Sequence, residues 1–281
     1  MKTIIVTDSS AGISKTEEKE LGIHVLRMPL TIDEQDYLEG EEISREDLIQ
    51  AMLEGKTVST SQPNLQYTID TFQKLLDKFN HIIYLPISKH LSGTFSTAYT
   101  LIDEFDGRVT VIDTDFVSWP LRVMSLQAKE LVEKGYTPVE VKNILESQSF
   151  MYASLIPEDL QYLKRGGRIT PAAAAVANLL KIVPVLKVTE GQIDLEEKVR
   201  THKKAIRFAL DKLQEFTPYE DYEWSVLNGG YDEEAFENIA KALEDKIKQP
   251  VNRGKLYPIV LAHTGPGSIG IVAVKKVEEL K

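Results

Sequence analysis

The chain has 281 residues and a mass of 31.7 kDa, a length that allows one large domain or two of ordinary size. Its 33 Lys and Arg residues against 43 Asp and Glu residues give a net charge of −10, which disfavours binding to a bare polyanion such as nucleic acid. The absence of cysteine excludes disulfide scaffolds, thiol nucleophiles and thiolate zinc sites.

The start of the sequence carries only a short apolar run, residues 4–6, before the polar residues 7–10. A secretory signal needs an apolar core of about 7 to 15 residues, and a membrane-spanning helix needs about 20. The sequence shows neither pattern. We therefore expect a cytoplasmic protein without stable insertion in a membrane.

The first half of the chain alternates short apolar runs with segments of helical periodicity. Residues 44–47 and 137–140 have the residue types of a helix-capping box, and Pro138 stands at the first helical position. The apolar runs, which are typical of parallel strands covered on both faces, are residues 4–6, 81–85, 109–112 and 153–156. This alternation predicts a doubly wound, parallel α/β domain over residues 1–155.

The second half has a different pattern. Residues 183–188 and 193–195 are separated by Gly191 and predict a hairpin. Further strands are expected at residues 224–227, 256–262 and 269–274, and helices at residues 158–164, 171–180, 201–216 and 232–247. These elements predict a second α/β domain with a mixed sheet over residues 156–281.

Residues 265–270 satisfy the pattern GxGxxG. A dinucleotide-binding turn of that kind must open a helix, whereas residues 271–274 have the residue types of a strand. We therefore interpret the motif as a tight turn between two strands.

Three hydroxyl-rich turns follow predicted strands or precede predicted helices, at residues 7–10, 59–63 and 88–94. Ligands of α/β sheets bind beyond the carboxyl ends of the strands, and a helix starting near Gly93 would present free N–H groups to an anion. His263 stands at the end of the apolar run 256–262 and is the best-placed of the five histidines. The pattern favours an acidic small molecule as ligand. Each turn alone is equally typical of a helix cap, and a histidine alone is typical of a structural hydrogen bond.

Two basic segments, residues 164–168 and 198–207, interrupt the acidic sequence. They are suited to a phosphate or to an acidic partner protein, and the Gly-Gly pair in the first leaves the backbone open to close approach. A solvent-exposed helix face with its own Glu partners is the alternative for any one of these residues.

Five segments together resemble the DegV proteins, the fatty-acid-binding subunits of bacterial fatty acid kinase that are often called FakB. The resemblance covers nearly the whole chain in the right order. The segments are Asp8-Ser9-Ser10-Ala11, Thr60-Ser61-Gln62-Pro63, Leu91-Ser92-Gly93-Thr94, residues 163–169 (LKRGGRI) and residues 262–267 (AHTGPG).

The resemblance implies a two-domain α/β protein that holds a long-chain fatty acid and presents it to a separate ATP-dependent kinase subunit, which forms the acyl phosphate for phospholipid metabolism. The chain itself would then be no enzyme and would need no metal or cofactor, in keeping with a sequence that lacks GxxxxGK[ST]. Arg168 and Arg200 correspond to basic residues that meet the kinase or the acyl phosphate. The carboxylate positions are Thr60, Ser61, Ser92, Gly93, His263 and Thr264.

The chain departs from the family pattern at several places. Residues 117–120 (VSWP) stand where a Gly-containing stretch is common, which leaves the shape of the tail pocket open. Residues 88–90 (SKH) replace a more usual Ser-Ser-Gly, residues 228–230 (NGG) replace a His-Ala-Gly type segment, and residues 181–184 lack the usual Lys before Pro.

Two other functions are compatible with parts of the sequence. An autonomous serine hydrolase or acyltransferase would use Ser92 as nucleophile and His263 as base, with Asp8 or Asp113 as the orienting carboxylate, but the sequence lacks a GxSxG elbow. A DNA-binding regulator is disfavoured by the charge balance and by the lack of a clear helix-turn-helix.

Overall fold

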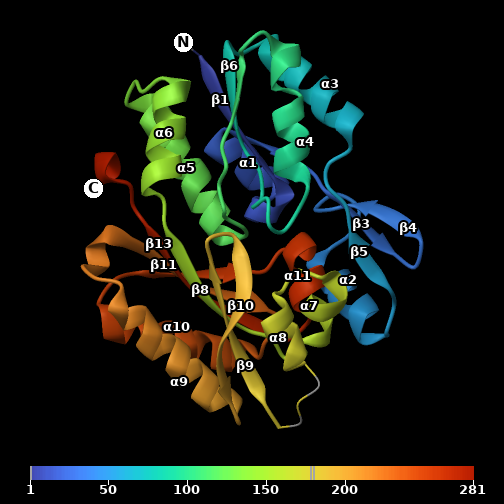
Figure 1. Cartoon of the computed structure of the whole chain (residues 1–281), viewed down its shortest axis with the longest axis vertical. Helices are drawn as coiled ribbons and strands as arrows, with labels where there is room; N and C mark the ends of the chain where they lie inside the picture. Colours follow the sequence, from blue (N-terminus) through green and yellow to red (C-terminus); the bar gives the residue numbers. More distant parts are fainter. Residues whose placement is uncertain (1, 178, 180) are drawn as a thin grey trace.

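The computed structural model describes residues 2–177, 179 and 181–281. It contains a parallel sheet in the upper part of Figure 1 and a mixed sheet in the lower part, and side chains from both belong to one hydrophobic core. The parallel sheet has the strand order β2-β1-β6-β7, and all neighbouring strands in it pair in parallel. Its strands are β1 (Thr3–Asp8), β2 (Ile23–Leu26), β6 (His81–Leu85) and β7 (Val109–Val111).

Helices cover both faces of the parallel sheet. Helices α3 and α4 pack on the face that carries Val6 and Tyr84, and α5 packs on the face that carries Ile5 and Ile83. The helices of this half of the chain are α1 (Lys15–Leu21), α2 (Arg45–Leu53), α3 (Leu65–Leu76), α4 (Thr94–Thr100), α5 (Trp119–Glu133) and α6 (Pro138–Gln148). Because strand side chains alternate between faces, the uniformly apolar strands are explained by burial on both sides.

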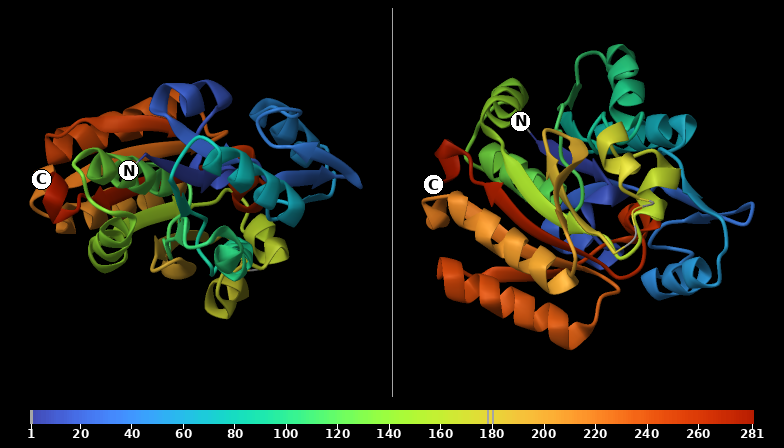
Figure 2. Two further views of the ribbon diagram at one scale, coloured as in Figure 1. Left: turned by 90° about the horizontal axis from the view of Figure 1, so that it is seen from above. Right: turned by 60° about the horizontal axis from the view of Figure 1, so that its bottom comes forward.

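A small antiparallel sheet, which the sequence did not suggest, is inserted between β2 and α3. Its order is β4-β3-β5, and it extends to the side of the molecule in Figures 1 and 2. Its strands are β3 (Pro29–Ile32), β4 (Gln35–Leu38) and β5 (Val58–Thr60). The end of β5 brings residues 60–62 toward the C-terminal half of the chain.

The mixed sheet has the order β10-β9-β8-β13-β11-β12, and only the pair of β11 and β12 in it is parallel. Its strands are β8 (Met151–Ile156), β9 (Val183–Thr189), β10 (Gln192–Val199), β11 (Tyr222–Gly229), β12 (Val251–Lys255) and β13 (Ser268–Lys275). The predicted fold class, a parallel α/β half followed by an α/β half with a mixed sheet, is thus confirmed.

The two faces of the mixed sheet have different partners. Helices α9 (His202–Lys212) and α10 (Glu233–Ile247) lie side by side and cover the outer face, where Tyr152, Trp224 and Val226 are buried against them (Figure 2). The inner face turns toward the N-terminal half, and its apolar side chains include Met151, Ala153, Leu155, Val188, Leu227 and Val272. The inner face is where an incompletely filled core would leave a cavity.

Shorter helices complete the C-terminal half. Helix α11 contacts α7, α2 and β5, so it lies at the junction of the two halves. These helices are α7 (Gln161–Gly166), α8 (Pro171–Ala175) and α11 (Pro258–Thr264). Short 3-10 turns occur at Ser9–Ala11, Ile102–Phe105, Leu213–Glu215, Tyr219–Asp221 and Glu278–Leu280.

The strand expected at residues 256–262 is wrong, because these residues enter helix α11. A short apolar run does not distinguish a buried strand from a buried helix, whereas Pro258 at the first helical turn was a usable signal. His263 therefore stands in the last turn of a helix, and the GxGxxG segment joins a helix to β13 rather than two strands.

Residues 153–156 form a strand as expected, but their assignment to the parallel sheet is wrong. They belong to β8, which pairs antiparallel with β13 and β9 in the mixed sheet. An apolar strand pattern reports burial and carries no information about the pairing partner. The division of the chain into domains at residues 155 and 156 stays a prediction.

Most other predicted elements are confirmed. Capping boxes start α2 at Ser44 and α6 at Thr137, and Gly191 forms the turn of the β9–β10 hairpin. The helix expected at residues 171–180 is shorter, because α8 ends at Ala175; residues 178 and 180 lie outside the described part of the chain.

Buried charged groups tie the end of β1 to its neighbours. Asp8 accepts hydrogen bonds from the backbone N–H of Ser10 at 3.0 Å and of Ile87 at 2.7 Å, and burial raises its pKa to about 6. Glu39 is fully buried, its carboxylate lies 3.9 Å from the guanidinium of Arg27, and burial raises its pKa to about 7. Both carboxyl groups therefore cost stability when they are ionised.

We predict that Glu39→Gln stabilises the protein at high pH. The pKa of Glu39 is about 7 in the folded protein, against an ordinary value of 4.5. The protonated side chain therefore contributes stability that is complete below pH 4.5 and is lost as the pH rises through 7. Urea unfolding of both proteins should show little difference at pH 5 and a gain of up to about 3 kcal/mol for the variant at pH 8. An equal effect at both pH values would contradict this account.

Candidate functional site: an apolar cavity with one polar end

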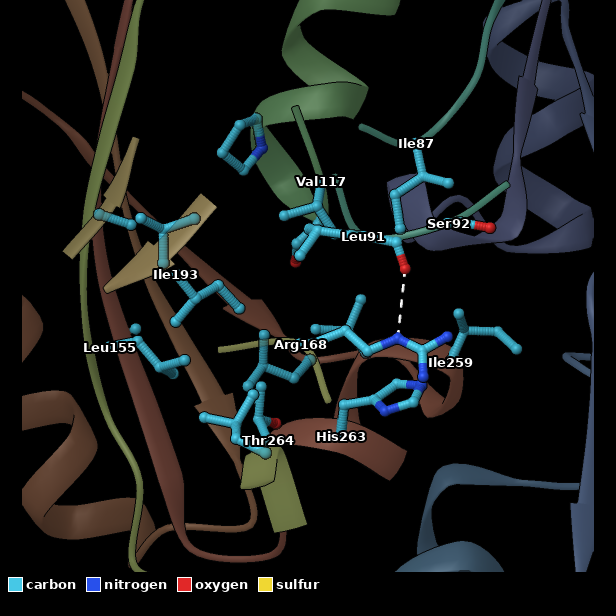
Figure 3. Close-up of a pocket in the computed structure, with 18 of the residues that line it drawn as sticks. Ile87, Leu91, Ser92, Val117, Leu155, Arg168, Ile193, Ile259, His263 and Thr264 are labelled. Atoms are coloured by element: carbon cyan, nitrogen blue, oxygen red, sulfur yellow. Dashed lines mark hydrogen bonds between the residues drawn. The ribbon is translucent and has the colours of Figure 1, made fainter. Parts of the chain in front are cut away.

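A cavity lies between the inner face of the mixed sheet, helix α11 and the loops that follow β5 and β6 (Figure 3). Its empty volume is about 880 Å³ when the open space at its mouth is counted. Its apolar lining comes from both halves of the chain: Met28, Ile87, Leu91, Val117, Pro120, Met151, Ala153, Leu155, Leu163, Val188, Ile193, Leu227, Leu256, Ile259, Val260 and Val272.

Polar side chains gather at one end of this cavity. The structure brings together Thr60 and Ser61 after β5, Ser92 before α4, Arg168 after α7, and His263 at the end of α11. Figure 3 shows the guanidinium of Arg168 beside the ring of His263, with Ser92 on a third element and its hydroxyl directed away from both. Gln62 and Thr264 also line the cavity. The arrangement is an apolar chamber with one polar end.

His263 is a largely buried titratable group of the polar end. Its Nε2 lies 2.7 Å from the hydroxyl oxygen of Thr60, and a Cβ on Gly166 would come within 2.5 Å of its Nδ1. Glycine at position 166 is therefore what lets the ring pack against helix α7. Burial, followed by the positive charge of Arg168, lowers the pKa of His263 to about 4. The ring is neutral at pH 7 and acts as a hydrogen-bond partner rather than as a cation.

Arg168 supplies the positive charge of the polar end. Its Nε donates to the carbonyl oxygen of Leu91 at 3.2 Å, and its Nη1 donates to the carbonyl oxygen of Gly166 (Figure 3). These two bonds hold the half-buried guanidinium against the cavity and leave other N–H groups for a ligand. The sequence placed Arg168 at the mouth as a contact for a partner; the structure also makes it part of the lining.

The other predicted site residues have different surroundings. The Ser92 hydroxyl lies 2.8 Å from that of Thr94, and Gly93 is the N-cap of α4 without lining the cavity. Thr264 is buried, and its hydroxyl oxygen accepts a hydrogen bond from Ser268 at 3.1 Å. Arg200 is exposed after β10 and is not part of the cavity lining. Five of the six predicted carboxylate positions therefore line one cavity.

Sequence reasoning missed two polar residues of the lining. Gln62 belongs to the segment 60–63 that resembles the family, but no role was predicted for its side chain. Ser118 lies in the segment 117–120, where the sequence signalled only a departure from the family pattern. No periodicity or spacing marks either side chain as part of a cavity.

The geometry disfavours the serine hydrolase. His263 Nε2 is bonded to Thr60 rather than to Ser92. Asp8 is held by Ser10 and Ile87, and Asp113 forms an ion pair with Lys89, so neither carboxylate orients the histidine. Within the described residues, the expected nucleophile, base and carboxylate do not form a relay.

Two further structural features bear on the kind of site. In the described part of the chain, no group of three or more His, Asp or Glu side chains is placed to hold a metal ion. Among the described residues, no helix is both long enough and apolar enough to cross a membrane.

We predict that His263 titrates near pH 4 and that Arg168→Gln raises its pKa by removing the nearby positive charge. Since the folded pKa lies below the ordinary 6.5, the neutral ring stabilises the fold above pH 6.5, and this contribution is lost as the pH falls to 4. Side-chain NMR of the wild type, the variant and the control Arg165→Gln measures both effects. The control guanidinium lies over the Tyr162 ring, outside the lining. Titration of the wild-type ring near pH 6.5 would contradict the assignment.

Comparisons with known proteins agree with this geometry. The model of the DegV family matches residues 2–276. A DegV domain-containing protein of Staphylococcus aureus is 32% identical over 285 aligned residues, which cover 98% of this chain and 99% of that protein.

Solved structures show the same architecture. A DegV family protein from Thermus thermophilus, described by its fatty acid binding, has a TM-score of 0.85 at 30% identity, covering 98% of this chain and 100% of that chain. A fatty-acid-binding DegV family protein from Streptococcus agalactiae has a TM-score of 0.88 at 27% identity, covering 98% and 99%. The family match and the curated relative, which extend over nearly the whole chain, establish that this protein belongs to the DegV family.

Proposed function

We propose that the chain binds one long-chain fatty acid, with the hydrocarbon in the apolar chamber and the carboxylate at the polar end. The observation that carries this proposal is a single guanidinium, Arg168, at one end of a cavity that is otherwise lined mainly by apolar side chains. The fatty acid binding described for the Thermus thermophilus and Streptococcus agalactiae relatives supports it.

The apolar chamber supplies the driving force. Burying about 14 methylenes at about 0.8 kcal/mol each gives a gross contribution of about 11 kcal/mol, before the entropy of association and ordering is subtracted. A ligand of this kind is retained tightly only if its charged end is also satisfied, because a desolvated carboxylate without a partner is costly.

The polar end meets that requirement with one charge and several hydroxyl groups. The guanidinium of Arg168 pairs with the carboxylate, and Ser61 and Ser92 donate hydroxyl hydrogens. Thr60 and the neutral His263 act as a coupled pair, since each orients the polar atom of the other at 2.7 Å. This network leaves the carboxylate neutralised without a second cation.

We further propose that the carboxylate is presented to a separate ATP-dependent kinase subunit, which forms the acyl phosphate for phospholipid metabolism. The chain then acts as the substrate-binding subunit in the bacterial cytoplasm and is no enzyme by itself. The lack of a GxxxxGK[ST] segment and the exposed Arg200 support this role. Arg168 would serve twice, first on the carboxylate and then on the transferred phosphoryl group.

We predict that Arg168→Gln weakens fatty acid binding by about 10- to 100-fold, because a charge-assisted hydrogen-bond pair is lost. Displacement of a fluorescent fatty acid measures the affinity, and Arg165→Gln is the matched control. The fatty alcohol of the same length should bind both proteins alike, since it has no charge to pair. Equal affinity of wild type and Arg168→Gln for the acid would contradict the assigned head-group site.

We predict that Arg200→Glu lowers turnover with the kinase subunit while the lipid stays bound. Charge reversal at an exposed contact weakens the encounter with an acidic partner face without touching the cavity. Steady-state kinetics of acyl phosphate formation and the lipid content of the variant measure the two effects. Arg108→Glu is the control, because Arg108 is also exposed but lies directly before β7, outside the basic segment 198–207. Unchanged kinetics in Arg200→Glu would remove this residue from the partner surface.

A further inference from the structure

Ser118 is a polar residue in the apolar part of the cavity lining. It lies directly before α5, between Val117 and the residues that start that helix, and it is 8% exposed. Val117 and Pro120, its neighbours in the lining, are apolar. In Figure 3, Val117 lies across the cavity from His263. Ser118 takes no part in the hydrogen bonds described above for Thr60, Ser92, Arg168 and His263, and its neighbours in the lining are apolar.

The hydroxyl of Ser118 has no protein partner among the described residues. A serine at the N-cap usually accepts a hydrogen bond from the helix backbone, but the Ser118 side chain makes no such bond. Only its backbone carbonyl is engaged, by the N–H groups of Leu121 and Arg122. The residue is 8% exposed and lines the cavity, so its unpaired hydroxyl is available to a group that enters the cavity from outside the chain.

The backbone of Ser118 gives a second, independent indication. Its φ of 62° and ψ of −148° fall in a region that is essentially restricted to glycine. A serine held in this conformation is strained, and residues under such strain concentrate at ligand-binding sites. Glycine would relieve the strain, yet the position carries a side chain whose one polar atom is unpaired.

We propose that Ser118 gives the cavity a hydrogen-bonding site along its hydrocarbon-binding part, so that the chain selects long-chain fatty acids with a hydroxyl or keto oxygen within the acyl chain. This inference rests on the proposed function, and it names the substrate class of the same cavity. The Ser118 hydroxyl donates to, or accepts from, the oxygen of the acyl chain while Arg168 holds the carboxylate.

The size of the effect follows from the interaction. One neutral hydrogen bond in a buried site favours the matching ligand by about 2- to 10-fold over an ordinary fatty acid of the same length. An oxygen at any other position along the chain is left unpaired among apolar side chains and weakens binding. The preference is therefore restricted to the carbons that reach Ser118.

Competition binding tests the proposal. Delipidated protein is mixed with stearic acid and with octadecanoic acids that each carry one hydroxyl at a different carbon, and the bound species are quantified by native mass spectrometry. We expect enrichment of one acid, or of neighbouring positional isomers, by about 2- to 10-fold over stearic acid.

Variants separate the hydroxyl from the backbone. Ser118→Ala and Ser118→Gly both remove the hydroxyl, and the glycine variant also relieves the strain, so it is expected to fold even if the alanine variant does not. Both should lose the enrichment while still binding stearic acid. Ser125→Ala is the matched control, because Ser125 lies on the same helix, donates to the carbonyl oxygen of Leu121 and is outside the lining.

Three results would overturn the inference in distinguishable ways. If stearic acid binds at least as well as every hydroxylated acid, the inference fails and the proposed function stands. If the enrichment persists in Ser118→Gly, the selecting group lies elsewhere. If none of the acids binds to wild type, the proposed function itself fails.

Discussion

The inner face of the mixed sheet is apolar, and the structure depends on how that face is covered. Helices α9 and α10 pack on the outer face, whereas helices α5 and α11 and the loops after β5 and β6 cover the inner face without filling the space. The residual chamber is lined by both halves of the chain, so its shape is set by their packing against each other. An unfilled apolar core is costly, and this cost becomes binding energy for a ligand that fills it.

The polar end of the chamber has a specific electrostatic balance. Burial keeps His263 neutral, and the neighbouring Arg168 reinforces this, so the site holds one positive charge rather than two. One guanidinium matches one carboxylate, and a neutral imidazole bonded to Thr60 adds direction without adding charge. Burial also raises the pKa of Asp8 at the end of β1. The Asp8 carboxyl accepts a hydrogen bond from the N–H of Ile87 and so holds the loop that places Ile87 in the cavity wall.

Sequence patterns were sufficient for the fold class and for most of the polar end. Hydroxyl-rich turns such as residues 60–63 and 91–94 carry recognisable local chemistry, and helix caps such as Thr137 are read directly from residue types. The helical state of residues 258–264 was not predictable from apolarity alone, because a buried helix and a buried strand share that pattern. The charge of His263 and the unpaired hydroxyl of Ser118 depend on tertiary burial and on one backbone conformation, which no local pattern encodes.

The most direct test of the central claim is mass spectrometry of the protein as purified, first in its native state and then after denaturation. The account predicts a stoichiometric small mass that is released on unfolding and has the composition of a fatty acid. A protein that is empty as purified, and still empty after incubation with a panel of long-chain fatty acids, would contradict the account.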